Sequence, residues 1–465
     1  MQLTSNRPSK RTARWPAVLA LVAACTMVSA AGCSSAAPKP SQATTVSFPN
    51  TSVGQQARWL FGAVLHPPIR TAEINAHFDA AFLAQVSPAQ LNASLAGVGD
   101  LRLDSITAST PGALVFLVTA NGKSKLSVSM SVDASGLISG LLLKPGTSPA
   151  ASPPPVPSTW AGVDSQIRSA APRVRFLVAS VSGSTCRPVQ AIDASTSAPL
   201  GSAFKLYVLD ALARAIAAGT VSWNQQLTVT SQVKSLPSGI LQNDPDGTRL
   251  SVQRVASGMI SISDNTAANM LISLLGRPAV EAATRTAGMA DPALDVPFLT
   301  TRELFVLKLD DWPRLADRYL ALNTAGRQAL LAGTIDKVPL AALNASAWFT
   351  PRDINSLEWF ASPTDICHVY ASLAALARQP KLAPVASVLE LNPDDMDLDS
   401  SQWRSVWFKG GSEPGVLTLN YLATTRSGQT YVASVLAENP SAPIPASATL
   451  TLLSAIKGAF ELAAR

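Results

Sequence analysis

Ser202 and Lys205 stand three residues apart at the start of a long apolar stretch, and their residue types suit nucleophilic chemistry. At this spacing, two side chains lie on one face of a helix and can reach each other. A serine hydroxyl is inert at neutral pH until a base takes its proton. A lysine can be that base only if its pKa falls from about 10.4 to near 7, which burial and a second nearby cation can cause. The pair therefore predicts an activated serine.

The serine–x–x–lysine pattern is weak evidence by itself, because it also begins at Ser231 and at Ser454. Two later motifs distinguish the three copies. Ser263-Asp264-Asn265 follows Ser202 by 61 residues, and Lys409-Gly410-Gly411-Ser412 precedes a predicted strand near the C-terminus. Ser231 lies too near the second motif, and Ser454 lies after the third. Ser202 is therefore the predicted nucleophile.

Each motif also has a purely structural explanation. Ser263-Asp264-Asn265 can be a helix cap, since these three residue types favour that role, and Lys409-Gly410-Gly411 can be a glycine-rich turn. A Ser-His-Asp triad is the competing catalytic scheme. His368 is the only histidine available to it, and no Gly-x-Ser-x-Gly elbow surrounds Ser202. The order and spacing of all three motifs favour the serine–lysine scheme.

In this order the motifs resemble those of the penicillin-recognising serine hydrolases, with a first spacing close to that of class A β-lactamases. The resemblance implies that Ser202 is the acylated nucleophile and that Lys205 is its base or proton relay. It further implies that Ser263 passes a proton to the leaving group. Asn265 would bind the substrate amide or position Lys205. No metal or organic cofactor is expected.

The same resemblance assigns the third motif to substrate binding. Lys409 would orient Ser263 and supply positive potential for a substrate carboxylate, and Gly411 and Ser412 would line the substrate. The backbone N–H groups of Ser202 and Ser412 would form the oxyanion hole, in which the loss of one donor often costs about 3–4 kcal/mol.

The sequence departs from class A at two places. Gly410 stands where the family usually carries threonine or serine, and losing a hydroxyl bond to a carboxylate costs roughly 1.5–3 kcal/mol, which Ser412 can offset only in part. The Glu-x-x-x-Asn arrangement of the deacylating base is also missing. The base is then Glu303, Asp353, Glu358 or none of these. Slow hydrolysis of the acyl-enzyme, or ester cleavage, is expected in place of efficient β-lactam turnover.

Hydrophobic periodicity predicts the elements that carry these motifs in an α/β domain over residues 159–465. Strands from both ends of this region should share one antiparallel sheet with flanking helices and an inserted helical region. The expected strands are Arg175–Val181, Leu417–Ala423 and Thr430–Ala437, and the expected helices are Gly201–Ala218, Thr449–Ala464 and one that begins at Ser362-Pro363.

Residues 51–147 predict a smaller α+β domain, separated from the first by a proline-rich linker at 148–158. Helical spacing over Gln55–Val98 is broken in two at His66-Pro67-Pro68. Alternating runs then predict a small antiparallel sheet, with a tight hairpin turn at Asn121-Gly122. The expected strands are Ala113–Ala120, Lys125–Val132 and Leu137–Leu143.

This two-domain layout resembles an actinobacterial family that includes mycobacterial lipoproteins and a clavulanic-acid-pathway protein with esterase or weak β-lactamase character. The resemblance implies a steroid-isomerase/NTF2-like cone for the N-terminal domain. Glu73, His77 or Asp79 could be polar groups in such a cone. A structural or docking domain with solvated acids is the favoured alternative.

Residues 1–32 have the pattern of a secretory signal. Four basic residues precede an apolar run, Trp15–Val28, that is shorter than the roughly 20 residues needed to span a bilayer. The run leads to Cys33 in a sequence that resembles a bacterial lipobox, and a Ser/Ala/Pro-rich tether fills residues 33–50. We therefore expect an exported protein anchored to the outer face of the cell membrane by lipid on Cys33. An ordinary signal peptide is the alternative.

The composition of the chain argues against several functional classes. The 465 residues are 47% hydrophobic, which is enough to bury a sizeable core. The net charge of +6 falls to +2 without the basic leader, so nothing supports nucleic-acid binding. Three histidines in the whole chain argue against a histidine-built metal centre. Export permits a disulfide between Cys186 and Cys367, but two separate buried thiols is the favoured reading.

The expected substrate is a small ester, a β-lactam or a peptidoglycan-type molecule, and the expected state is a monomer. Two other functions stay open. One is a weakly catalytic protein that binds penicillin or a cell-wall ligand, and the other is a D,D-peptidase.

Overall fold

The computed structural model describes residues 47–465, except 96–97, 110–112, 123, 134, 146–153, 237, 346–347, 392–395 and 446. The predicted signal peptide, Cys33 and most of the tether lie outside the described residues, as does most of the predicted linker. Among the described helices, none has the length and hydropathy that crossing a bilayer requires.

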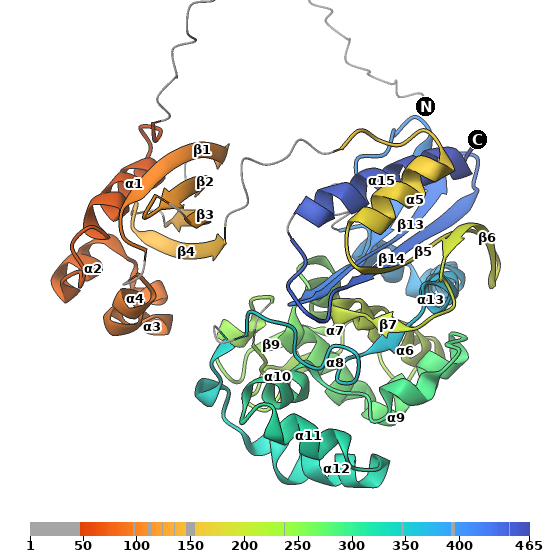
Figure 1. Ribbon diagram of the computed structural model, residues 1–465. Coiled ribbons are helices and arrows are strands. Elements are labelled where there is room, and N and C mark those ends of the chain that lie inside the picture. Colours follow the sequence, from red (N-terminus) through yellow and green to blue (C-terminus); the bar gives the residue numbers. More distant parts are fainter. Residues whose placement is uncertain are drawn as a thin grey trace, which may run out of the picture. The chain divides into compact units, whose positions relative to one another are not determined.

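The N-terminal part packs four short helices with one antiparallel sheet (Figure 1). Its strands pair in chain order, so the predicted α+β arrangement is confirmed. Asn121 and Gly122 both have positive φ, 50° and 67°, as the predicted tight turn requires. The elements are α1 (Ser52–Ala63), α2 (Thr71–His77), α3 (Ala80–Gln85), α4 (Pro88–Leu95), β1 (Leu101–Ser109), β2 (Ala113–Ala120), β3 (Ser124–Val132) and β4 (Ile138–Pro145).

Two details of this part differ from prediction. The predicted helical stretch forms four helices rather than two. At the end of α2 the backbone of Phe78 is extended and forms a β-bridge with Ile138 of the sheet, and Asp79 then caps α3. Strand β1 was not predicted, because register shifts after Leu103 and after Ile106 interrupt its alternation of apolar and polar residues.

The three polar residues proposed for a ligand cone all have structural partners. Glu73 accepts a hydrogen bond from the indole N–H of Trp59 at 3.2 Å. The ring of His77 stacks on Trp59 with centroids 3.8 Å apart, and its Nδ1 bonds Gln56 at 2.8 Å. Asp79 accepts from the backbone N–H of Phe82. These contacts favour the structural alternative.

The C-terminal part is built on an antiparallel sheet in the order β11-β13-β14-β5-β6, with β12 paired to β13. Strands from the two ends of this region meet where β14 pairs with β5, which confirms the predicted shared sheet. Edge strand β6 was missed because most of its residues are exposed. The strands are β5 (Arg173–Ser182), β6 (Thr185–Ile192), β11 (Trp403–Phe408), β12 (Gly411–Glu413), β13 (Val416–Thr425) and β14 (Thr430–Glu438).

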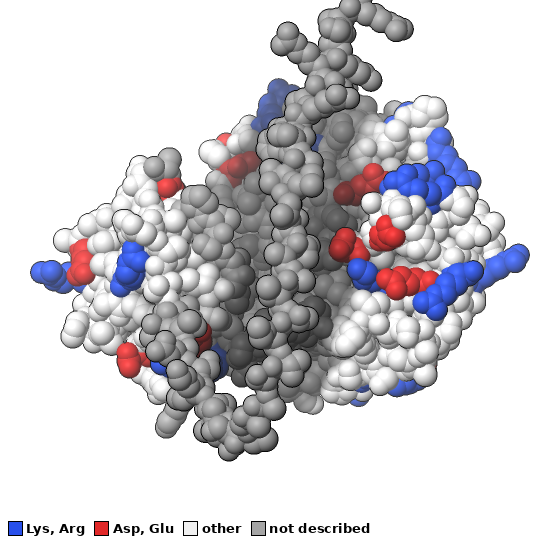
Figure 2. All heavy atoms as spheres, turned by 90° about the horizontal axis from the view of Figure 1, so that it is seen from above, with Lys and Arg blue, Asp and Glu red and all other residues white. Residues whose placement is uncertain are grey.

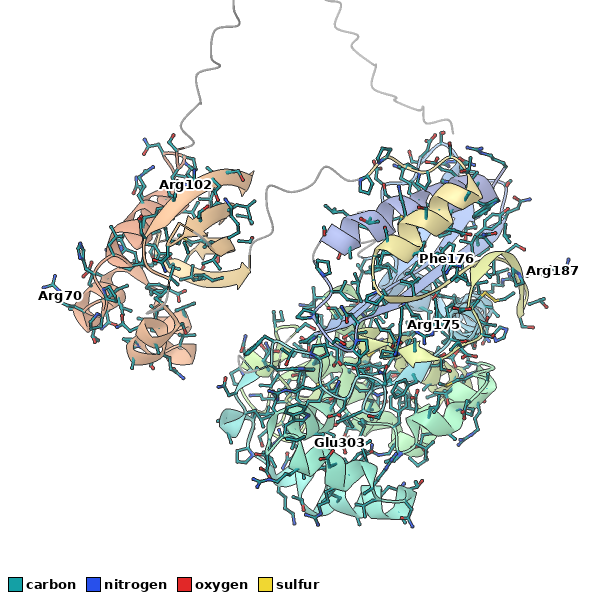
Figure 3. The ribbon with its side chains drawn as sticks, viewed as in Figure 1. Arg70, Arg102, Arg175, Phe176, Arg187 and Glu303 are labelled. Carbon is teal, nitrogen blue, oxygen red and sulfur yellow. A yellow bond between two sulfur atoms is a disulfide. The ribbon has the colours of Figure 1, made fainter. Side chains whose placement is uncertain are left out.

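Helices cover both faces of this sheet (Figure 1). Phe176 and Val178 pack with α5 (Trp160–Ser169) and α15 (Ser447–Ala463) on one face, and Phe176 is labelled in Figure 3. Leu177 and Ala179 belong to the larger core on the other face, with α6 (Lys205–Ala218) and α13 (Pro363–Leu376). This alternation along β5 follows from the two-residue period of a strand.

An inserted region of helices completes the domain, as predicted (Figure 1). Its helices are α7 (Val252–Ser261), α8 (Asn265–Leu275), α9 (Arg277–Thr286), α10 (Thr301–Leu309), α11 (Arg314–Leu320), α12 (Thr324–Gly333) and, after α13, α14 (Pro384–Leu389). Two small ribbons accompany them: β7 (Ala198–Pro199) with β10 (Phe360–Ala361), and β8 (Gln226–Thr228) with β9 (Arg249–Ser251).

Cys186 and Cys367 form a disulfide, with their Cα atoms 6.3 Å apart. The expectation of two separate thiols is therefore wrong. The bond joins edge strand β6 to α13, which packs against it. A separation of 181 residues says nothing about distance in space, so the sequence alone could not decide the pairing.

Candidate active site

Ser202 lies in a single 3₁₀ turn, Gly201–Phe204, that leads directly into α6. Gly201 has φ +50°, a conformation in which glycine is favoured. Its position also leaves no room for a side chain, since a Cβ there would lie 2.8 Å from the backbone nitrogen of Ser412. The turn brings Lys205 Nζ to 3.1 Å from Ser202 Oγ, a hydrogen-bonding distance.

Lys205 is completely buried and held by oxygen acceptors. Its Nζ lies 2.6 Å from the backbone oxygen of Ser263 and 2.6 Å from Asn265 Oδ1. Burial lowers the pKa of Lys205 well below its ordinary value, the positive charge of Lys409 lowers it further, and Asp264 opposes both. A lowered pKa is what a lysine base requires.

Ser263 places its hydroxyl between two lysines. Ser263 Oγ is 3.2 Å from Lys205 Nζ and 3.0 Å from Lys409 Nζ. Ser263 has φ +56°, a left-handed conformation that serine rarely adopts. In this conformation both its carbonyl and its hydroxyl reach Lys205. A proton can therefore move from Ser202 through Lys205 to Ser263.

Asp264 holds this arrangement in place. One carboxylate oxygen caps α8 by accepting from the N–H of Ala267, and the other accepts from Ile240 and Leu241. Gly239 fits closely beside it, since a Cβ there would lie 2.2 Å from Asp264 Cγ. The second motif thus ties the start of α8 to the loop that carries Ser238.

The glycines of the third motif allow β12 to lie against the nucleophile. A Cβ on Gly411 would lie 2.5 Å from the backbone nitrogen of Ser202. A Cβ on Gly410 would lie 2.9 Å from the backbone oxygen of Thr418 and 2.7 Å from the ring of Phe408. Close packing against β13 therefore accounts for glycine at this position of the third motif.

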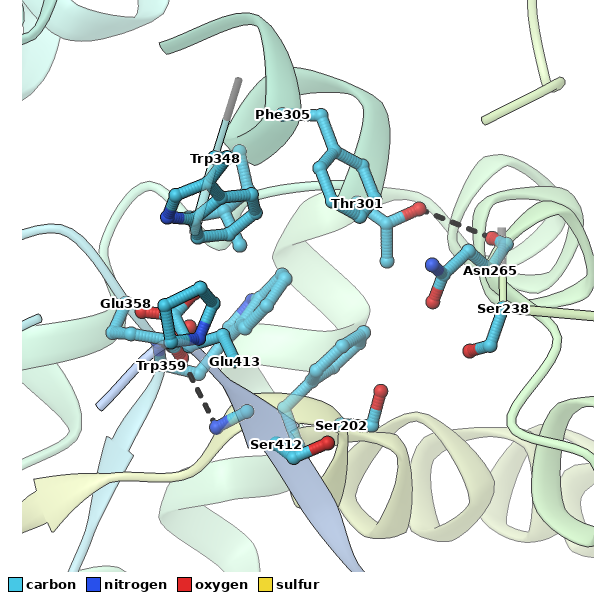
Figure 4. Close-up of a pocket in the computed structure, with 14 residues that line it drawn as sticks. Ser202, Ser238, Asn265, Thr301, Phe305, Trp348, Glu358, Trp359, Ser412 and Glu413 are labelled. Atoms are coloured by element: carbon cyan, nitrogen blue, oxygen red, sulfur yellow. Dashed lines mark hydrogen bonds between the residues drawn. The ribbon is translucent and has the colours of Figure 1, made fainter. Parts of the chain in front are cut away.

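The cleft around Ser202 has two lobes, both lined by Ser202, Ser238 and Ser412. One lobe, of about 270 Å³, which we call the aromatic lobe, has four aromatic residues in its lining, and Figure 4 shows three of them, Phe305, Trp348 and Trp359. The other, of about 370 Å³, contains Lys409 and Ser263. A substrate carbonyl at Ser202 can thus place an apolar group in one lobe and a polar group near Lys409 in the other.

Residues 167–457, more than half of the chain, match the sequence model of the Beta-lactamase enzyme family. The chain belongs to this family. Residues 48–138 match a second family model, described as ORF 12 gene product N-terminal. No curated protein sequence matches the chain significantly.

Several solved β-lactamase structures align with about two thirds of this chain. A β-lactamase from Sphaerobacter thermophilus is 21% identical over 66% of this chain and 97% of its own, with a TM-score of 0.46. An ancestral class A β-lactamase is 18% identical over 65% of this chain and 98% of its own, with a TM-score of 0.44. A class A β-lactamase from Mycobacterium abscessus is 15% identical over 66% of this chain and 99% of its own, with a TM-score of 0.43.

Only one of the three candidate deacylating bases lines this β-lactamase-family cleft. Glu303, labelled in Figure 3, closes a capping box with Thr300 and pairs with Arg277 at 2.7 Å. Asp353 accepts a hydrogen bond from the indole of Trp312. Glu358 lines the aromatic lobe. The structure thus leaves Glu358 as the one sequence-derived acid placed at the site.

Sequence reasoning missed several residues that line the cleft, among them Ser238, Glu413 and the aromatic residues Phe305, Trp348 and Trp359. Ser238 donates a hydrogen bond to the carbonyl of Ser263 at 2.8 Å and contributes to both lobes. Glu413 lines the aromatic lobe, and the available signal was its position directly after Ser412. Within the described residues, no group of three or more His, Cys, Asp or Glu side chains is arranged to hold a metal ion.

Proposed function

We propose that this β-lactamase-family protein is an exported, lipid-anchored serine hydrolase that cleaves small esters or amides through an acyl-Ser202 intermediate. The observation that carries the proposal is the buried amine of Lys205, 3.1 Å from Ser202 Oγ, with its pKa lowered by burial and by Lys409. A neutral amine at this distance can take the proton that makes the serine nucleophilic.

Acylation follows from the hydrogen bonds of the site. Ser202 Oγ attacks the substrate carbonyl carbon as its proton passes to Lys205 Nζ. The carbonyl oxygen gains the negative charge, and the N–H groups of Ser202 and Ser412 stabilise it. When the bond to the leaving group breaks, Ser263 gives the leaving group a proton and regains one from Lys205, 3.2 Å away. Water then cleaves the acyl ester and restores Ser202.

Esters with an apolar acyl group fit this cleft better than carboxylated β-lactams. The aromatic lobe offers Phe204, Phe305, Trp348 and Trp359 to such a group. Gly410 leaves Lys409 without the neighbouring hydroxyl that would help to bind a β-lactam carboxylate, and packing against Thr418 excludes one there. We therefore expect esters to be turned over faster than penicillins or cephalosporins.

The test uses chromogenic esters of increasing acyl length, a chromogenic cephalosporin, and intact-protein mass spectrometry. We expect an acyl adduct on Ser202 and ester turnover that disappears in Ser202→Ala. The same turnover in Ser202→Ala, with no adduct in the unmodified protein, would overturn the proposal.

A weakly catalytic binding protein is the second candidate, because Glu303 and Asp353 both have structural partners and are not among the residues that line the cleft. A stable penicillin adduct on Ser202 without measurable turnover of any ester would favour it.

Lipid anchoring at Cys33 is the cellular part of the proposal, and the sequence pattern of residues 1–33 supports it. We expect Cys33→Ser to abolish incorporation of radiolabelled palmitate. Unchanged labelling of that variant would contradict the anchor.

A further inference from the structure

A lysine and two glutamates are buried together beside the aromatic lobe of the cleft, and no step of the hydrolysis described above uses them. Lys308, near the end of α10, is completely buried, and the side chains of Glu358 and Glu413 are 1% and 6% exposed. Lys308 Nζ lies 2.5 Å from Glu413 Oε1 and 3.7 Å from Glu358 Oε1. A buried charged cluster is costly unless its members compensate one another.

The two glutamates are attached to the two backbone segments that would form the oxyanion hole. Glu358 Oε2 accepts a hydrogen bond at 3.2 Å from the N–H of Gly201, the residue directly before Ser202. Figure 4 labels Glu358 and also Glu413, which directly follows Ser412. Lys308 therefore connects the segment of one oxyanion donor to the segment of the other.

Other bonds hold the same segments from the sheet. Thr418 on β13 donates to the carbonyl of Leu200 at 2.9 Å, and β12 pairs with β13. Lys308 instead reaches them from the inserted helical region. The segments of Ser202 and Ser412 are thus held from two sides. The charged cluster holds them on the side of the aromatic lobe.

We propose that Lys308, Glu358 and Glu413 are positioning residues that hold the backbone N–H groups of Ser202 and Ser412 at the separation needed to bind the oxyanion. The inference rests on the proposed function, because an oxyanion forms only if Ser202 is acylated. Displacing reacting groups by about 1 Å can slow an enzyme about 100-fold, so the geometry of this cluster matters to the rate.

The charges of this cluster balance when the two carboxyl groups together carry one proton. Both carboxyl groups face the same buried ammonium, at 2.5 and 3.7 Å, and two like charges so close together disfavour ionisation of both. Burial raises the pKa of Glu413 well above its ordinary value, Lys308 opposes this, and Glu358 adds to it. One ammonium then faces one carboxylate and one neutral acid. Glutamine at position 413 can replace that neutral acid, since its amide can accept from Lys308 and donate to Glu358.

The experiment compares Lys308→Met, Glu413→Ala and Glu413→Gln with a control, Lys234→Met, which removes a lysine from its ion pair with the half-exposed Asp246. The full-length protein in detergent is assayed with a chromogenic ester, and its affinity for an aryl boronic acid is measured, because the boronate forms a tetrahedral adduct at serine that mimics the oxyanion. Mass spectrometry of the acylated protein gives the fraction of active sites.

We expect kcat per active site to fall about 10- to 100-fold in Lys308→Met and Glu413→Ala, with KM within about threefold. Boronate affinity should fall in parallel, and Glu413→Gln should stay within about threefold of the unmodified protein in both measurements. If Lys308→Met does not fold, Glu413→Ala and Glu413→Gln still test the inference. Both remove the carboxyl group, but only Glu413→Ala also removes the side chain's ability to form hydrogen bonds.

Equal kcat and equal boronate affinity in Glu413→Ala and Lys234→Met would overturn the inference, as would a Glu413→Gln variant as slow as Glu413→Ala. These outcomes presuppose that the unmodified protein is acylated on Ser202. If mass spectrometry finds no acylated Ser202 in the unmodified protein, the proposed function is wrong. If Ser202 is acylated but the variants behave as described above, only the positioning role is wrong.

Discussion

The hydroxyl of Ser263 lies within 3.2 Å of two lysine amines, and this arrangement makes the charge of one lysine depend on the other. Lys409 donates to Ser263 Oγ and to the carbonyl of Gly410, so it can remain charged. Lys205 is fully buried, and the charge of Lys409 adds to the effect of burial on its pKa. In the proposed mechanism, Lys205 is therefore the base and Lys409 the fixed cation.

The pH dependence of acylation tests this division. Lys205 acts as a base only when neutral, so activity is lost as the pH falls through its lowered pKa. Because Lys409 is the second cause of that lowering, Lys409→Ala should raise the pKa of Lys205 and move the midpoint of the rate–pH profile to higher pH. The rate of ester acylation measured from pH 5 to 10 checks this, and an unmoved midpoint would contradict it.

Gly410 gives a second prediction for a single residue. Gly410→Ala adds a Cβ that meets the backbone oxygen of Thr418 at 2.9 Å, and overpacking of this kind costs about 1–3 kcal/mol. We expect a lower free energy of unfolding in urea and no gain in cephalosporin hydrolysis. The control is Gly333→Ala in α12, where a Cβ would meet nothing within 4 Å; equal stabilities of the two variants would refute the packing argument.

At the scale of elements, the start of α8 links Lys205 to the loop that contains Ile240 and Leu241. The carboxylate of Asp264 caps α8 and receives two further N–H groups, those of Ile240 and Leu241. The same residue precedes Asn265, which binds Lys205, and follows Ser263. A change at Asp264 should therefore affect stability and catalysis together.

Asp264→Ala should lower the free energy of unfolding by about 2–4 kcal/mol, because a helix cap is worth about 1 kcal/mol and buried N–H groups without acceptors cost more. Asp264→Asn keeps one capping oxygen and should lose less. Urea denaturation and ester kcat measure both effects. A stable, fully active Asp264→Ala protein would show that the loop and helix are held in other ways.

At the scale of the whole molecule, charges of both signs lie side by side on the visible, described surface. On the part of the visible face that is not grey in Figure 2, Lys and Arg side chains lie close to Asp and Glu side chains. Arg173 and Arg175 share Glu438, for example, and Arg314 pairs with Asp311.

The disulfide between β6 and α13 also acts on the whole C-terminal part, because it closes a loop of 181 residues in the unfolded chain. Replacing Cys186 and Cys367 together by alanine should lower the free energy of unfolding by about 2–4 kcal/mol. Urea unfolding with and without dithiothreitol provides the comparison: the reductant should destabilise the unmodified protein and leave the double variant unchanged. An equal response in both would rule out the bond as the cause.

Local spacing was enough to predict the central part of the candidate site. Ser202 and Lys205 share one turn, so their contact depends on neighbouring residues alone. The run that forms β5 and the alternating runs that form β13 and β14 were enough to predict three strands of the sheet. The order of the three motifs along the chain selected the serine–lysine pair that lies beside Ser263 in the structure, and the family match over residues 167–457 agrees with the fold that the motifs implied.

Only the tertiary structure decided which distant residues join that core. It paired Cys186 with Cys367, left Glu358 alone among the three candidate bases at the cleft, and brought Lys308 between Glu358 and Glu413. These contacts join residues that lie 50 to 181 positions apart. The spacing of such residues carries no information about their distance, because it is set by how helices and strands pack rather than by the geometry of any one of them.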